Sequence, residues 1–126
     1  TTAAIEPALD AMVKARIQGL MIIGDGLFFQ SRPIFKKLIL ARRIPTVVHS
    51  REMLEAGAIL SYGTNNSDVV FRTPTLVERI FKGAKAGEIP VEAPTKFELL
   101  LNPNVAKQFG ISFSSDLLLR ADQVIE

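Results

Sequence analysis

The amino-acid sequence predicts an α/β fold with three layers, in which helices flank a doubly wound, mostly parallel sheet. The first observation behind this prediction is that apolar residues at helical spacing alternate three times with short, continuous apolar runs. The second is that the connections between these segments are short, as in βα units. A chain of 126 residues is also long enough to bury a hydrophobic core.

The N-terminal third of the chain contains the first helices and the first strand. Apolar residues at helical spacing predict a helix over residues 5–17, and a buried strand follows over residues 20–24. Ser31 can cap a second helix with Pro33 in its first turn. The segment 25–31, "DGLFFQS", is therefore expected to be a loop between strand and helix.

The alternation then continues through the middle of the chain. A second strand is predicted near residues 45–49, followed by a short helix that Ser50 caps and Gly57 closes. A third strand is predicted over residues 58–62, followed by the polar turn "GTNNSD".

The helix after this turn is expected to end at Lys82, and Pro74 leaves two alternatives for it. The helix either starts near residues 73–75 or is kinked at the proline. The aperiodic segment 84–96 is typical of a connecting arm. A strand over residues 97–101, a short helix and a last strand complete the prediction.

Composition excludes several classes of function. The net charge is +2, and the basic residues are scattered among acids, so no phosphate-binding stripe and no nucleic-acid partner is expected. Dinucleotide, P-loop and serine-hydrolase motifs are missing from the sequence. With no cysteine and a single histidine, no metal site or cofactor is expected. The sequence therefore favours ligand binding without catalysis.

A ligand site is expected where the three predicted parallel strands end. Right-handed crossovers place the carboxyl ends of such strands on one edge of the sheet, where ligands bind in doubly wound folds. The candidate ligand-binding residues follow these strand ends: Asp25, Phe28, Phe29, Ser50, Arg51, Ser61 and Tyr62.

These side chains suit a small polar or zwitterionic ligand with an apolar part. Asp25 can pair with an ammonium group, Ser50 and Ser61 can donate to a carboxylate, and the aromatic rings can flank an apolar group.

Each candidate also has a structural interpretation. Asp25 before a glycine forms turns, and Ser50 can be a plain helix cap. Of Phe28 and Phe29, one is expected to pack under the next helix and one to face the cleft. A lone histidine at a strand end, His49, is more often structural than functional.

Four segments of the sequence resemble one protein family. They are "DGLFFQSR", "IPTVVHSREMLEAGAILSYG", "ERIFKGAKAGEIPVEAPTKFELLLN" and "AKQFGISFSSDLLLRADQVIE". Together they resemble the C-terminal portion of ABC-transporter substrate-binding proteins, in the branch related to tryptophan- and tyrosine-binding members. The resemblance runs along essentially the whole chain.

The resemblance implies one lobe of a type I periplasmic-binding-protein fold, acting as the non-enzymatic solute-binding component of an ABC importer. By the same resemblance, a missing N-terminal lobe would close over the ligand, and an ABC permease would receive it. Asp25 would hold the ammonium of an amino-acid ligand, the loop with Ser50 would help with its carboxylate, and residues 61–63 would line the pocket. The location implied is the periplasm or the outer face of the membrane.

The resemblance also implies a division of the chain. Residues 1–90 would form the ligand-binding lobe, and residues 91–126 the hinge crossover and a C-terminal segment that contacts the other lobe. Five apolar residues would lose part of their cover without that lobe: Phe97, Leu99, Leu101, Phe109 and Phe113. Dimerisation or segment exchange is therefore expected. The alternative function is the effector-sensing domain of a transcription regulator, which uses the same lobe architecture.

Overall fold

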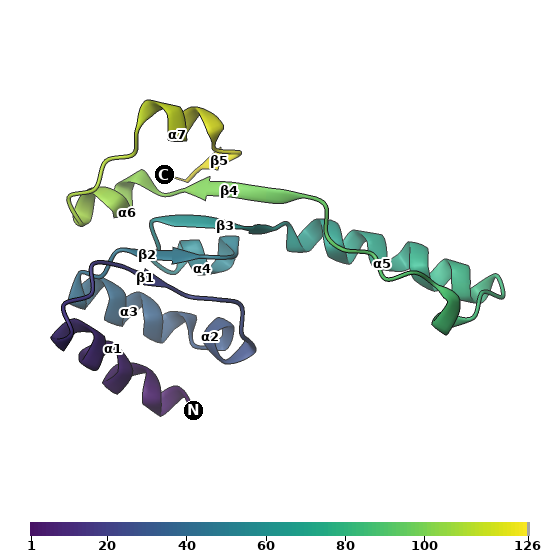
Figure 1. Ribbon diagram of the computed structural model, residues 1–126, viewed down its shortest axis with the longest axis horizontal. Coiled ribbons are helices and arrows are strands. Elements are labelled where there is room, and N and C mark those ends of the chain that lie inside the picture. Colours follow the sequence, from purple (N-terminus) through teal and green to yellow (C-terminus); the bar gives the residue numbers. More distant parts are fainter. Residues whose placement is uncertain (126) are drawn as a thin grey trace. The chain divides into compact units, whose positions relative to one another are not determined.

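The computed structural model describes residues 1–125 and contains one helix or strand for nearly every predicted element (Figure 1). Its elements in chain order are α1 (Ile5–Lys14), β1 (Leu20–Met21), α2 (Gly26–Gln30), α3 (Arg32–Arg42), β2 (Thr46–Val48), α4 (Arg51–Glu55), β3 (Leu60–Thr64), α5 (Asn66–Phe81), β4 (Phe97–Leu101), α6 (Pro103–Gln108), α7 (Ser115–Arg120) and β5 (Gln123–Val124). Short 3₁₀ turns lie at Thr2–Ala4 and Ala86–Glu88.

The described strands form a five-stranded sheet in the order β1-β2-β3-β4-β5. Strands β1, β2 and β3 are parallel, with Leu20 opposite Thr46 and Val47 opposite Leu60. Strand β4 runs in the opposite direction to β3, as the arrows in Figure 1 show, and β5 is parallel to β4. The predicted mostly parallel α/β sheet is confirmed.

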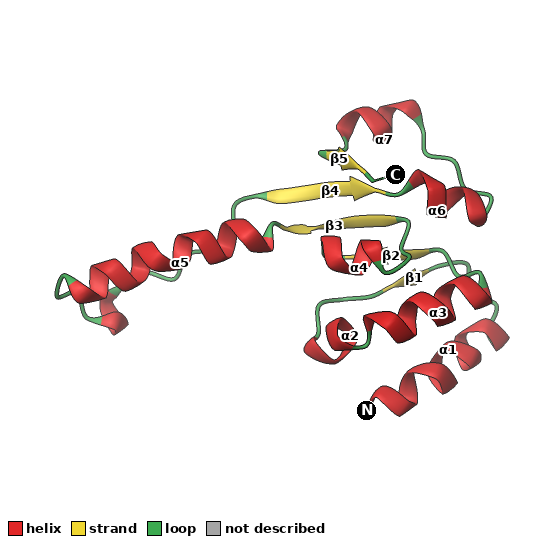
Figure 2. Ribbon diagram, turned by 180° about the vertical axis from the view of Figure 1, so that it is seen from behind, coloured by secondary structure: helices red, strands yellow, loops and turns green. Residues whose placement is uncertain are grey.

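The core lies between the sheet and helices α1, α3 and α4. It contains Ile5, Leu9, Ile22, Phe35, Leu38, Ile39, Ile44, Val48, Met53, Leu54, Ala58 and Leu100. Seen from behind, in Figure 2, α4 lies in front of β2. Helices α1 and α3 carry buried apolar residues three and four positions apart, so each buries one stripe, whereas the short α4 buries the adjacent Met53 and Leu54.

Helix α3 is joined to α1 by charge as well as by packing. In its last turn, Arg42 donates from Nε to Asp10 at 2.8 Å and from Nη2 to Glu6 at 3.0 Å. These hydrogen bonds, the one to Asp10 first, raise the pKa of Arg42 above its usual value. A cation in the last turn is also favoured by the partial negative charge at a helix C-terminus.

The chain divides into two compact units. Unit 1 comprises Thr1–Gly63 together with the residues from Glu98 onward, and unit 2 comprises Thr64–Phe97. The predicted boundary between residues 90 and 91 refers to the intact protein with both lobes and stays a prediction. The residues of β4 from Glu98 onward return to the sheet of unit 1, which a reading of local sequence alone did not anticipate.

Two helices differ from their predicted form. Residues 26–30 form α2 rather than a loop, because Asp25 caps this helix by accepting a hydrogen bond from the Leu27 amide at 2.8 Å. Helix α5 starts at Asn66, whose N-terminus is capped by Asn65, and continues through Pro74. The start near residues 73–75 was therefore wrong.

Of the five apolar residues expected to lose part of their cover, Phe97 is exposed and Leu99, Phe109 and Phe113 are partly buried. Leu101 is completely buried, against the expectation. Large exposed apolar side chains occur on α5 (Val70, Phe71, Phe81), in and after the outer strand β1 (Met21, Ile23) and at other positions such as Val91 and Leu119.

Candidate functional site

The carboxyl ends of β1, β2 and β3 lie side by side, as the parallel pairing requires. Continuing the observed register places Ile23 beside His49 and His49 beside Tyr62. The contact between β2 and β3 is so close that a Cβ at Gly63 would lie 1.9 Å from the carbonyl oxygen of His49. Only glycine fits there, and the fit brings the three strand ends to one edge.

A groove of about 320 Å³ opens at this edge. Its lining is drawn from all three strands and consists of Met21, Ile22, Ile23, Gly24, Val47, Val48, His49 and Tyr62. Glycine at position 24 leaves room for the histidine ring, since a Cβ there would lie 3.2 Å from Nε2 of His49. The groove is mainly apolar, with an imidazole and a phenol at its end.

The segment after β1 places its two phenylalanines differently. Phe28 packs edge-on against Phe35, with ring centroids 5.7 Å apart, and belongs with the core. Phe29 is exposed, and the guanidinium carbon of Arg32 lies 3.8 Å from the centre of its ring. Asp25 is exposed at the start of α2, with Oδ1 engaged by the helix N-terminus.

The candidates after β2 and β3 also divide into buried and exposed residues. Ser50 is only 4% exposed and sits at the N-cap of α4. Next to it, Arg51 donates from Nη2 to Oε1 of Gln123 at the start of β5. Along β3, Ser61 is 2% exposed and points into the sheet interior, whereas Tyr62 is 60% exposed and lines the groove.

Unsatisfied polar atoms occur in the segments that follow the same strands. Within residues 1–125, the buried side-chain atoms that lack a hydrogen-bond partner are Nη1 of Arg32, Nδ1 of His49, Oγ of Ser50 and Oε2 of Glu52. All four residues follow β1 or β2 in the chain. Buried polar groups are nearly always paired, so these exceptions in the segments after β1 and β2 are candidates for contact with a ligand.

Three of these four residues were not among the candidates from the sequence. Arg32 and Glu52 lie one or two positions inside predicted helices, where a charged side chain is ordinarily solvated. His49 was considered and interpreted as structural. The usable signal was position, because each follows a strand end at the edge where ligands bind.

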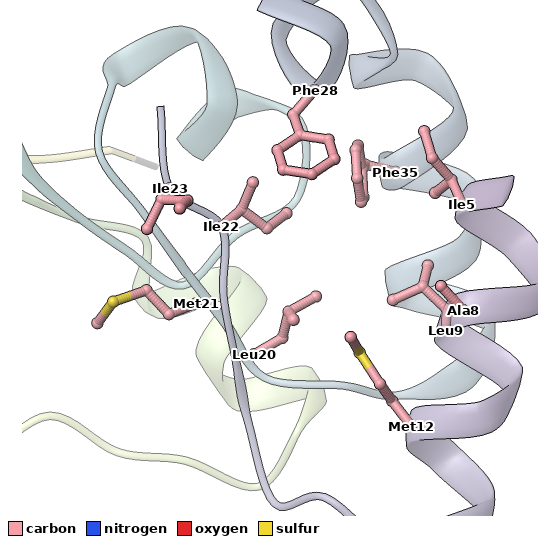
Figure 3. Close-up of a pocket in the computed structure, with 10 residues that line it drawn as sticks. All are labelled: Ile5, Ala8, Leu9, Met12, Leu20, Met21, Ile22, Ile23, Phe28 and Phe35. Carbon is pink, nitrogen blue, oxygen red and sulfur yellow. The ribbon is translucent and has the colours of Figure 1, made fainter. Parts of the chain in front are cut away.

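A second hollow lies between α1 and β1, away from these polar atoms. Figure 3 shows that Leu20 and Ile22 point toward α1, while Met21 and Ile23 point to the other side of the strand. The hollow has a volume of about 160 Å³, and every residue that lines it is apolar. It offers no partner for a charged or polar ligand, so the groove at the strand ends is the candidate site.

Searches for a metal site and for a membrane span were both negative. The described residues contain no group of three or more histidine or acidic side chains that could hold a metal ion. Within residues 1–125, none of the helices has the length and apolar character needed to cross a membrane.

Comparison with solved structures supports the fold. The chain is similar to a conserved domain protein from Vibrio cholerae (TM-score 0.91, 21% identity). It is equally similar to an ABC domain from Streptococcus pneumonia in complex with L-Trp (TM-score 0.91, 22% identity). Each alignment covers 99% of this chain and 42% of the other.

Sequence comparison finds a curated relative as well. The chain is 23% identical over 107 residues to a tyrosine-binding protein from Clostridioides difficile. The match covers 85% of this chain and 31% of that protein, so the chain spans about a third of its relative's length. The family model for ABC transporter substrate-binding proteins matches residues 1–125. The chain therefore belongs to the ABC transporter substrate-binding protein family, whose members bind solutes and are not enzymes.

Proposed function

We propose that this chain forms one wall of the solute-binding cleft of an ABC importer and captures an aromatic amino acid. In this proposal the protein acts outside the cytoplasmic membrane, a second lobe closes over the ligand, and a permease receives it. The family match favours this transport role over the effector-sensing domain of a transcription regulator.

The observation that carries the proposal is the combination of side chains at the strand ends. The exposed rings of Phe29 and Tyr62 and the unsatisfied atoms of His49 and Ser50 belong to the ends of β1, β2 and β3 or to the segments that follow them. A ligand there meets apolar surface along the groove and polar atoms at its end. Amino acids with aromatic side chains combine an apolar ring with a charged ammonium and carboxylate in the same way.

Two relatives support the choice of ligand. One is named as a tyrosine-binding protein, and the other was solved in complex with L-Trp. In the proposal, Asp25 holds the ligand ammonium with its second carboxylate oxygen, and Ser50 donates to the carboxylate. Phe29 and Tyr62 contact the aromatic ring of the ligand. Phe28 and Ser61 support the site from the protein interior, and Arg51 does so through its hydrogen bond to Gln123 of β5.

The test replaces Asp25 by Asn and measures ligand binding by ligand-observed NMR, which detects weak complexes. Asparagine caps helices as well as aspartate does, so α2 should persist while the negative charge is lost. We expect Asp25→Asn to abolish binding of L-tryptophan and to leave binding of indole-3-propionate, which lacks the amine, unchanged.

Unchanged binding of L-tryptophan by this variant would contradict the ammonium role of Asp25. If the unaltered chain binds none of the aromatic amino acids, the proposed ligand class itself is wrong. An amide spectrum of Asp25→Asn that matches the parent chain serves as the control for folding.

A further inference from the structure

Helix α3 begins and ends with an arginine, and the two arginines are in opposite electrostatic situations. Arg42, in the last turn, is paired with Asp10 at 2.7 Å and Glu6 at 3.0 Å. Arg32 is the first residue of the helix, where the partial positive charge of the N-terminus disfavours a cation. Helix formation and packing therefore account for Arg42 but not for Arg32.

The guanidinium of Arg32 is held in place. Its central carbon lies 3.8 Å from the centre of the Phe29 ring, a cation–π contact that restricts the side chain. Nη1 is buried and has no hydrogen-bond partner among residues 1–125. Arg32 as a whole residue is only partly buried.

An unpaired buried donor on a charged group is costly, and an anion would remove the cost. The same anion would be favoured by the N-terminus of α3, which is eleven residues long. A second donor, Oγ of Ser50, also lacks a hydrogen-bond partner within the described chain. Ser50 follows the neighbouring strand β2 and is only 4% exposed. Both donors belong to segments that follow strands of the candidate site, Arg32 after β1 and α2 and Ser50 after β2.

We infer that Arg32, held against Phe29, recognises the carboxylate of the ligand together with Ser50. The inference rests on the proposed function and specifies its ligand class, namely molecules with a free carboxylate beside the aromatic group. A guanidinium donates two parallel hydrogen bonds to a carboxylate, a geometry that lysine or serine cannot supply.

The experiment compares two ligands that differ only in the carboxylate. Dissociation constants for L-tryptophan and tryptamine are measured by NMR titration on the chain, on Arg32→Gln and on Lys37→Gln. Lys37 is the matched control, because it is an exposed cation on the same helix and its replacement changes the net charge equally. Amide spectra verify that each variant folds.

We expect Arg32→Gln to weaken L-tryptophan binding by about tenfold or more, the size of a charge-assisted hydrogen bond. Tryptamine binding should be unchanged in this variant, and Lys37→Gln should alter neither ligand. Arg32→Lys keeps the positive charge but cannot donate two parallel hydrogen bonds. Its affinity for L-tryptophan should therefore lie between those of the unaltered chain and Arg32→Gln.

Equal weakening of both ligands would show that Arg32 only supports the loop and would overturn the inference. So would unchanged binding of L-tryptophan. In both cases the unaltered chain still binds its ligand, and the proposed function stands. Failure of the unaltered chain to bind either ligand overturns the proposed function and the inference together.

Discussion

Unit 1 and unit 2 both contain amphipathic helices, but they differ in what the apolar stripes contact. In unit 1, the stripes of α1, α3 and α4 meet the sheet and form the core. In unit 2, no residue of α5 is buried, although the whole helix is described. The segment 84–96, which follows α5, contacts this helix through ion pairs instead. They join Arg72 and Arg79 to Glu92, and Lys96 to Asp68.

The two units are therefore stabilised by different interactions. Burial of large apolar side chains stabilises unit 1 strongly, whereas exposed ion pairs contribute little. Unit 2 also exposes a stripe of Val70, Pro74, Val77 and Phe81 beside a shallow groove. By the same physical argument, we expect unit 2 to gain stability when a surface covers this stripe.

The largest effect should follow from a cavity in the core of unit 1. Leu54 of α4 is 0% exposed. Replacing it by alanine should lower the free energy of unfolding by about 2–5 kcal/mol, because transfer and cavity terms add. Urea unfolding followed by circular dichroism measures this. The matched variant Leu119→Ala, at an exposed position of α7, should have little effect. Similar losses in both variants would contradict the assignment of the core.

An intermediate effect on stability is expected when Gly63 is replaced by alanine, with the same replacement at Gly87 as the control. Gly63→Ala places a Cβ against the His49 carbonyl, and the resulting shift of backbone should cost about 1–3 kcal/mol. Gly87→Ala, in the 3₁₀ turn of unit 2, meets no heavy atom within 4 Å and should be close to neutral. Thermal unfolding of both variants checks the contrast. If Gly63→Ala is as stable as Gly87→Ala, β2 and β3 are not in the close contact described.

The smallest effect concerns the exposed stripe of unit 2. We expect the chain to associate at high concentration through this stripe, since Phe81 is 85% exposed beside Val77. Phe81→Ser should weaken association by about tenfold, which corresponds to about 1.4 kcal/mol. Sedimentation equilibrium measures the effect, with Lys85→Ser as the control on the same arm. A strict monomer at high concentration would contradict this expectation.

Local pattern was sufficient for most of the elements and insufficient for the ligand site. Helices α1, α3 and α5 were expected from apolar spacing, although α1 ends at Lys14 rather than at the predicted residue 17 and α5 starts earlier than residues 73–75. The segment 26–30 was not, because Asp-Gly is typical of turns and its capping hydrogen bond depends on the conformation reached. The unpaired atoms of Arg32 and Glu52 could not be predicted either, because local sequence does not determine which polar groups form hydrogen bonds in the folded chain.

The sequence by itself determined the periodicity of helices and strands and the parallel arrangement of the first three strands. It also placed Asp25, Ser50 and Tyr62 at strand ends, because these properties depend on neighbouring residues and on the handedness of crossovers. Only the tertiary structure decided that residues from Glu98 onward return to the sheet of unit 1. It also decided that Ser61 is buried while His49 faces the groove, and that Arg42 is paired while Arg32 is not. These outcomes depend on contacts between segments far apart in the chain, which no local pattern encodes.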